Sequence, residues 1–134
     1  MSPELFWMAA TALLTSLMWA PYIVSLILER GLVSALTERV GDDPGPAAWA
    51  ERAQRAHRNA VENLVVFAPL AIGVHVAGAG TGVTAAAAAI FFVTRLAHYV
   101  VYCTGIPVAR TLIFAVGVFC QITLGVALLT AAPA

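Results

Sequence analysis

The organisation of this chain is clearest at residues 51–70, which read ERAQRAHRNAVENLVVFAPL. The first twelve of these residues carry glutamates, arginines and a histidine, and the remainder is apolar apart from one asparagine. On an α-helix, at about 100° per residue, most of the polar side chains fall within about 60° of Arg55. These are Glu51, Arg52, Arg58, Asn59 and Glu62. His57 points away from this face. The segment therefore predicts a helix whose polar face continues into an apolar, membrane-spanning half.

The composition around this helix is that of a membrane protein. The chain has 134 residues, of which 61% are hydrophobic and 10% are charged, whereas soluble domains carry about 25% charged residues. A helix that crosses a bilayer needs about 20 predominantly apolar residues. Four such segments are expected, at about 5–28, 47–77, 83–103 and 107–131. We therefore expect an all-α membrane protein, a single domain over 1–134 that forms a bundle of four transmembrane helices.

The connections between the expected spans differ in length and charge. Pro21 is expected to kink the first span, and the charged, turn-rich segment 29–46 is expected to be a polar loop. Small residues at 78–82 end the second span, whose Pro69 can be accommodated within a membrane bundle. The apolar start of the chain continues to Leu28, which is longer than the core of a signal peptide, so we expect a retained anchor.

Neither a disulfide nor a metal centre is expected. Cys103 and Cys120 lie in apolar segments without a pairing motif, which favours buried thiols. No three histidine, cysteine or carboxylate side chains share one expected helical face, as a metal site would require.

The arginines predict the orientation in the membrane. Five of the seven fall between residues 30 and 58, and the opposite side of the bundle carries no arginine or lysine. By the positive-inside rule, the 29–50 and 104–109 loops therefore face the cytoplasm, and both termini face away from it. Glu4 is the one charged residue expected on that opposite side.

A second polar face is expected on the third span. Arg95, His98 and Tyr102 are spaced i, i+3 and i+7 and therefore project from one side of a helix. Two structural alternatives stay open, in which Arg95 forms an internal ion pair with Glu62 and Tyr102 is an anchor at the membrane interface. Polar groups at this depth usually face a bundle interior or a polar cavity. The two polar faces are therefore typical of a pocket between helices.

Arg110 and Thr111 open the fourth span, at the same end of the bundle as the polar face of the second. Arg110 is either part of the pocket or an arginine whose head group reaches back to the membrane surface. Together with the arginines of the second span it makes a cationic site, to which asparagine, tyrosine and glutamate add specificity. Such a site suits a small polar ligand with carboxylates, beside an apolar ligand supplied from the lipid.

These elements resemble the MAPEG family, the membrane-associated proteins of eicosanoid and glutathione metabolism. RAQRAHRNAVEN, followed by an apolar run with FAPL, is similar to the helix-two signature of that family, and RLAHYVVY and GIPVARTL resemble its third and fourth helices in bacterial members. The resemblance covers essentially the whole chain, and the second helix is its specific part. It implies a homotrimer of four-helix protomers in a bacterial inner membrane, with glutathione bound between neighbouring subunits near the cytoplasmic face.

The resemblance also implies roles for single residues. The positions that match glutathione contacts in the family are Arg55, Arg58, Asn59, Glu62, His98, Tyr102 and Arg110, with Arg30 as a looser match and Arg95 added from the polar face of the third span. Arg110 is expected to hold the thiol as thiolate, because adjacent cations lower the pKa of a thiol. Thr111 is expected to hydrogen-bond to the sulfur. Phe114 stands where some relatives have a tyrosine.

We therefore expect a membrane-bound, thiol-dependent transferase or peroxidase. Its cosubstrate is glutathione or another low-molecular-weight thiol, and its second substrate is a lipophilic electrophile or hydroperoxide. The expected partners are further copies of the chain, in a homotrimer, and membrane lipids, whereas no nucleic acid is expected. The trimer follows because one protomer buries too little polar surface to hide its intramembrane charges. Two alternatives stay open, a non-catalytic lipid-binding or scaffold protein of the same fold and a small transporter or channel.

Overall fold

The computed structural model describes residues 1–37 and 47–131. The secondary structure within these ranges is helical, without a β-strand, in six elements: α1 (Pro3–Leu17), α2 (Ala20–Arg30), α3 (Leu32–Thr37), α4 (Ala48–Val76), α5 (Gly82–Thr104) and α6 (Pro107–Leu129). Four segments are long and apolar enough to cross a membrane, with α1 and α2 together forming the first. The expected all-α membrane bundle is therefore confirmed.

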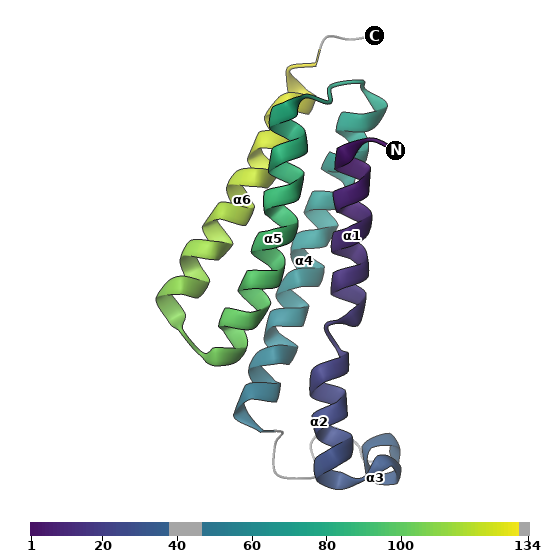
Figure 1. The fold of residues 1–134 in the computed structure, drawn as a ribbon, viewed down its shortest axis with the longest axis vertical. Coiled ribbons are helices and arrows are strands. Elements are labelled where there is room, and N and C mark those ends of the chain that lie inside the picture. The colour runs from purple at the N-terminus through teal and green to yellow at the C-terminus, as the bar shows by residue number, and fades with distance from the viewer. Residues whose placement is uncertain (38–46, 132–134) are drawn as a thin grey trace.

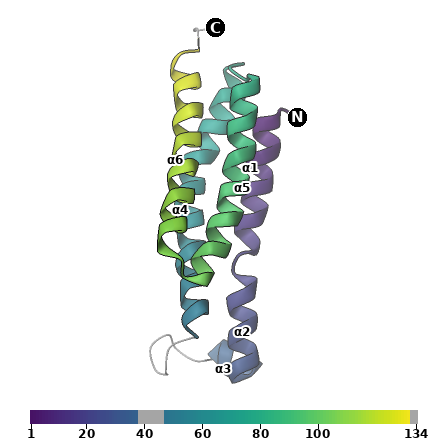
Figure 2. The same ribbon diagram turned by 60° about the vertical axis from the view of Figure 1, so that its left-hand side comes forward.

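The four spans run up and down, so that each span is antiparallel to the next in the chain (Figure 1). The start of α1, the turn between α4 and α5, and the end of α6 lie at one end of the bundle. The opposite end carries α3 and the turn between α5 and α6 (Figure 2), and we call it the α3 end. Helices α4 and α5 pack against each other, and each also packs against α1 and α6, so these two helices form the centre of the bundle.

The first span is broken rather than kinked. Helix α1 ends at Leu17 and α2 begins at Ala20, so the interruption lies just before Pro21, which occupies the first turn of α2. Proline suits that position because it lacks the N–H that a first turn leaves unbonded. In lipid a freed carbonyl needs another donor, and the Tyr99 hydroxyl of α5 donates to the Met18 carbonyl at 2.9 Å. The break is thus stabilised by a neighbouring helix.

The polar loop expected at 29–46 is partly helical, which corrects that prediction. Glu29 and Arg30 belong to the last turn of α2, and Leu32–Thr37 form α3. Gly31 joins the two helices with φ 83°, a left-handed value that glycine adopts without steric strain. The turn-rich remainder, 38–46, lies outside the described residues.

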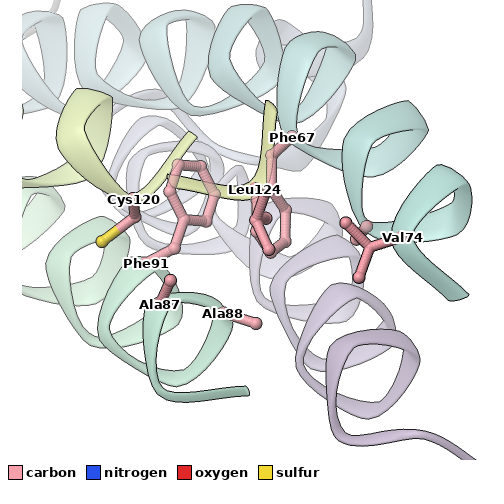
Figure 3. Close-up of a cluster of buried hydrophobic side chains, with 8 residues drawn as sticks. Phe67, Val74, Ala87, Ala88, Phe91, Cys120 and Leu124 are labelled. Atoms are coloured by element: carbon pink, nitrogen blue, oxygen red, sulfur yellow. The ribbon is translucent and has the colours of Figure 1, made fainter. Parts of the chain in front are cut away.

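The apolar core lies between α4, α5 and α6 (Figure 3), in the half of the bundle away from α3 (Figure 1). Its centre is the stacked pair Phe67 and Phe91, whose ring centroids are 3.9 Å apart. The small side chains Ala87 and Ala88 are buried beside them, and small residues let membrane helices approach closely. This close packing fixes the relative positions of three helices. The polar side chains that the same helices carry towards the α3 end are thereby placed as well.

Candidate functional site

Helix α5 presents the expected polar face to the other helices. Arg95 is 1% exposed and His98 is 4% exposed, and Tyr102 is half-buried one turn further towards the α3 end. The His98 and Tyr102 rings meet edge to face, with centroids 5.5 Å apart. The spacing of these residues therefore places three polar groups in one row inside the bundle.

Arg110 of α6 closes this row at the α3 end. Its guanidinium carbon lies 4.7 Å from the centroid of the Tyr102 ring, a cation–π contact. Within the described residues no carboxylate pairs with Arg110. The Arg110 guanidinium is thus held against α5, with N–H groups left for another acceptor.

Phe114 joins the row from α6, one turn after Arg110. Its ring centroid is 6.2 Å from that of His98 and 5.8 Å from the guanidinium carbon of Arg95. A phenyl ring packed against a cation needs no hydroxyl, which gives a structural reason for phenylalanine at this position. The sequence analysis noted Phe114 only because some relatives have a tyrosine there, and it did not predict these contacts.

Arg95 is buried among α4, α5 and α6, and it pairs with no carboxylate among the residues that the structure describes. Its Nη1 donates to Asn59 Oδ1 at 3.5 Å, and its Nε and Nη2 have no partner. The ring of Phe91 lies 5.2 Å from the guanidinium carbon on the α5 side. The internal ion pair with Glu62 that the sequence left open is therefore not formed, and two nitrogen atoms of a buried cation remain without an acceptor among the described residues.

Two amides that the sequence analysis did not select connect this cation to α4 and α6. Gln121 Nε2 donates to the Asn63 carbonyl at 3.1 Å, and Asn63 Nδ2 donates to the Asn59 carbonyl at 2.8 Å. We call Gln121, Asn63 and Asn59 the amide relay. The sequence could have pointed to Asn63 and Gln121, because each is a lone amide in an apolar span and such a group is costly in lipid unless it is hydrogen-bonded.

The other predicted residues of α4 face away from the bundle. Arg55 is exposed and pairs with Glu51 at 2.6 Å on the same helix. Arg58 and Glu62 are also exposed, and neither forms an ion pair within the described residues. The polar face predicted for this helix thus divides, because Asn59 turns towards α5 while the charged groups stay outside.

Arg30 and Thr111 lie apart from the row on α5. Arg30 ends α2, which packs against α3 and α4. The Thr111 hydroxyl is exposed and donates to the Pro107 carbonyl of its own helix at 3.1 Å. Thr111 also lines an open hollow of about 310 Å³ on the outer side of α6, with Pro107, Val108 and Leu112. Apolar surface therefore lies one helical turn from Arg110.

The arrangement has the chemistry of an anion site at the edge of a membrane. Arg95 and Arg110 supply N–H groups without carboxylate partners in the described chain, and Asn59 and Tyr102 supply uncharged polar groups beside them. Cations placed in this way stabilise carboxylates and thiolates.

Comparison with known proteins places this arrangement in a family. The search of curated proteins and the search of solved structures each gave no match. The model of one protein family, the MAPEG family, matches residues 5–130, which is nearly the whole described bundle. The chain therefore belongs to the MAPEG family.

Proposed function

We propose that the protein is an integral membrane transferase or peroxidase that uses glutathione or another low-molecular-weight thiol. Its second substrate is a lipophilic electrophile or hydroperoxide. The observation that carries this proposal is the Arg110 guanidinium, held 4.7 Å from the Tyr102 ring without a carboxylate partner among the described residues. Family membership supports a glutathione-related activity in general.

Arg110 is the proposed activator of the thiol. A guanidinium beside the sulfur favours the thiolate, which is the nucleophilic form. With an electrophile, the thiolate forms a bond to carbon and displaces a leaving group or adds to a double bond. With a hydroperoxide, it attacks the outer oxygen and releases an alcohol, and a second thiol then yields the disulfide and water. Thr111 joins this step if its hydroxyl exchanges the Pro107 carbonyl for the sulfur.

The remaining predicted residues are proposed to bind the polar parts of the thiol. Arg55, Arg58 and Glu62 present charges on the outside of α4, and Asn59, Arg95, His98 and Tyr102 line the adjacent row. Arg30, at the end of α2, is proposed to contribute to the thiol site of a neighbouring copy.

A homotrimer is proposed because charges lie exposed at the middle of the bundle. Glu62 is exposed next to Asn63, whose carbonyl is bonded to Gln121 near the middle of α6. An ionised side chain facing lipid at this depth is costly. Further copies of the chain cover this face of α4 in the proposed assembly and complete the thiol site.

The α3 end is proposed to face the cytoplasm of a bacterial inner membrane. The arginines of α4 and α6 gather at this end, and the positive-inside rule places such ends in the cytoplasm. A soluble thiol would then reach the row from the cytoplasm, while the apolar substrate would enter from the lipid.

The decisive experiment replaces Arg110 by alanine and compares it with Arg55→Ala. We expect Arg110→Ala to lower kcat with a chromogenic electrophile by about tenfold to hundredfold, since a lost charge contact is worth roughly 1.5–3 kcal/mol. Arg55→Ala should mainly raise the KM for the thiol, because Arg55 is proposed to bind the thiol equally strongly in the ground state and in the transition state. The pH dependence of kcat at saturating glutathione reports the apparent pKa of the bound thiol, which should rise in the Arg110 variant.

Two outcomes would contradict this proposal, the first in the role given to Arg110 and the second in the function itself. Unchanged kcat and unchanged thiol pKa in Arg110→Ala would make that arginine a membrane anchor. Absence of turnover with any electrophile or hydroperoxide in the unaltered protein, together with binding of lipids, would favour the non-catalytic lipid-binding alternative.

A further inference from the structure

The amide relay has a fixed hydrogen-bond direction. Asn63 Nδ2 faces the backbone carbonyl of Asn59 at 2.8 Å, and Gln121 Nε2 faces the backbone carbonyl of Asn63 at 3.1 Å. A carbonyl can only accept, so in both side chains the NH₂ group must be the atom that faces it. The orientation of each amide is thereby set by the backbone of α4.

The relay and Arg95 together orient Asn59. Asn63 Nδ2 also lies 3.3 Å from Asn59 Oδ1, and Arg95 Nη1 lies 3.5 Å from the same oxygen. A guanidinium carries donors and no acceptor, so the side of Asn59 turned towards it has to be the oxygen. A reversed amide would direct its N–H groups at two other donors.

The NH₂ group of Asn59 has no acceptor among the described residues. Its oxygen is occupied by Asn63 and Arg95, and no residue in 1–37 or 47–131 accepts a hydrogen bond from its Nδ2. Asn59 is half-buried at the edge of the face that carries Arg55 and Glu62. Its NH₂ group therefore remains available to a ligand on that face.

We propose that Asn63 and Gln121 are positioning residues that fix Asn59 as a hydrogen-bond donor towards the thiol cosubstrate. The group placed against Asn59 is then an acceptor, a carboxylate or a peptide carbonyl, and an ammonium group is excluded from this position. This inference rests on the proposed function, because it assigns a role at the same thiol site. Neither amide touches the ligand, since Asn63 is 8% exposed and Gln121 is 9% exposed.

The test is a double-variant comparison of glutathione binding to the purified protein in detergent, measured by calorimetry. Gln121→Met removes the first donor while keeping an unbranched side chain of similar length. We expect its Kd to rise roughly twofold to tenfold, the range for one neutral hydrogen bond. Asn59→Ala should show at least this loss, and the variant with both changes should bind as Asn59→Ala does, because Gln121 acts through Asn59.

Thr94→Val is the matched control. Thr94 is buried in the same layer, but its hydroxyl donates to the Phe91 carbonyl of its own helix at 2.7 Å. We expect its Kd to match that of the unaltered protein. If Gln121→Met does not fold, Asn63→Leu interrupts the relay one step closer to the site and is compared with Asn59→Ala in the same way.

The outcomes separate the inference from the function on which it rests. If the unaltered protein binds neither glutathione nor another low-molecular-weight thiol, the proposed function fails and the inference fails with it. If it binds glutathione but Gln121→Met has no effect, or the losses of Gln121→Met and Asn59→Ala multiply, the positioning role is wrong and the proposed function stands.

Discussion

Gly117 of α6 leaves the space that the Arg95 guanidinium occupies. A Cβ atom at this position would lie 2.3 Å from Arg95 Nη2, 3.1 Å from its Cζ and 3.3 Å from Thr94 Oγ1. Ordinary contact with a Cβ begins at 3.4 Å, so the guanidinium of a Gly117→Ala variant would have to move by about 1 Å. The end of an arginine side chain usually moves easily, but here it is 1% exposed and confined between Phe91 and Phe114.

The expected result is a loss of both stability and thiol affinity. Overfilling a packed core costs about 1–3 kcal/mol, and the Arg95–Asn59 bond, already 3.5 Å long, would be lost in such a shift. Gly125→Ala is the matched control on the same helix, since its Cβ would meet only Leu70 Cδ2, at 3.8 Å. That variant should be neutral, or more stable by up to about 1 kcal/mol, because alanine favours a helix over glycine.

Denaturant unfolding in detergent and calorimetric titration with glutathione measure the two effects. The free energy of unfolding of Gly117→Ala should lie at least about 1 kcal/mol below that of Gly125→Ala. Equal stability of the two variants, with unchanged glutathione affinity, would show that Arg95 does not depend on the space at Gly117 and would refute this reasoning.

The other predictions concern the helix break, the orientation and the assembly. Tyr99→Phe removes the donor to the Met18 carbonyl and should lower the free energy of unfolding by about 1–3 kcal/mol; an unchanged unfolding curve would show that the break does not need this bond. A cysteine at Ser2, with Cys103 and Cys120 replaced by serine, should react with a membrane-impermeant reagent from outside the inner membrane, and labelling restricted to the cytoplasmic side would overturn the orientation. Light scattering in mild detergent should give the mass of three chains, whereas a monomer would contradict the trimer.

The sequence predicted what depends on spacing along one helix. Arg95, His98 and Tyr102 share a face because their separations match the helical period, and the structure places two of them in the interior. The same reasoning placed His57 opposite the charged face of α4, where it is hydrogen-bonded to Tyr22 of α2 at 2.9 Å.

What depends on the alignment of one helix against another could not be predicted. The amide relay requires Asn63 to lie level with Gln121, 58 residues away. The periodicity of residues within one helix does not predict how that helix aligns with another. The supposed partner of Arg95 was wrong for the same reason, because Glu62 lies on the outer side of α4 and Asn59 on the inner side. Helix α3 was missed because the charges on either side of 32–37 indicated a loop.

The amide relay also bears on how the chain enters the membrane during synthesis. An arginine at the centre of a span opposes insertion by about 2.5–3.5 kcal/mol, so α5 with Arg95, and α4 with two asparagines, are poor candidates for release into lipid one at a time. The donor for the Asn63 carbonyl belongs to α6, which is translated after α4 and α5. We expect α4 and α5 to remain beside the insertion machinery until α6 arrives, and all three to partition into the bilayer as one unit.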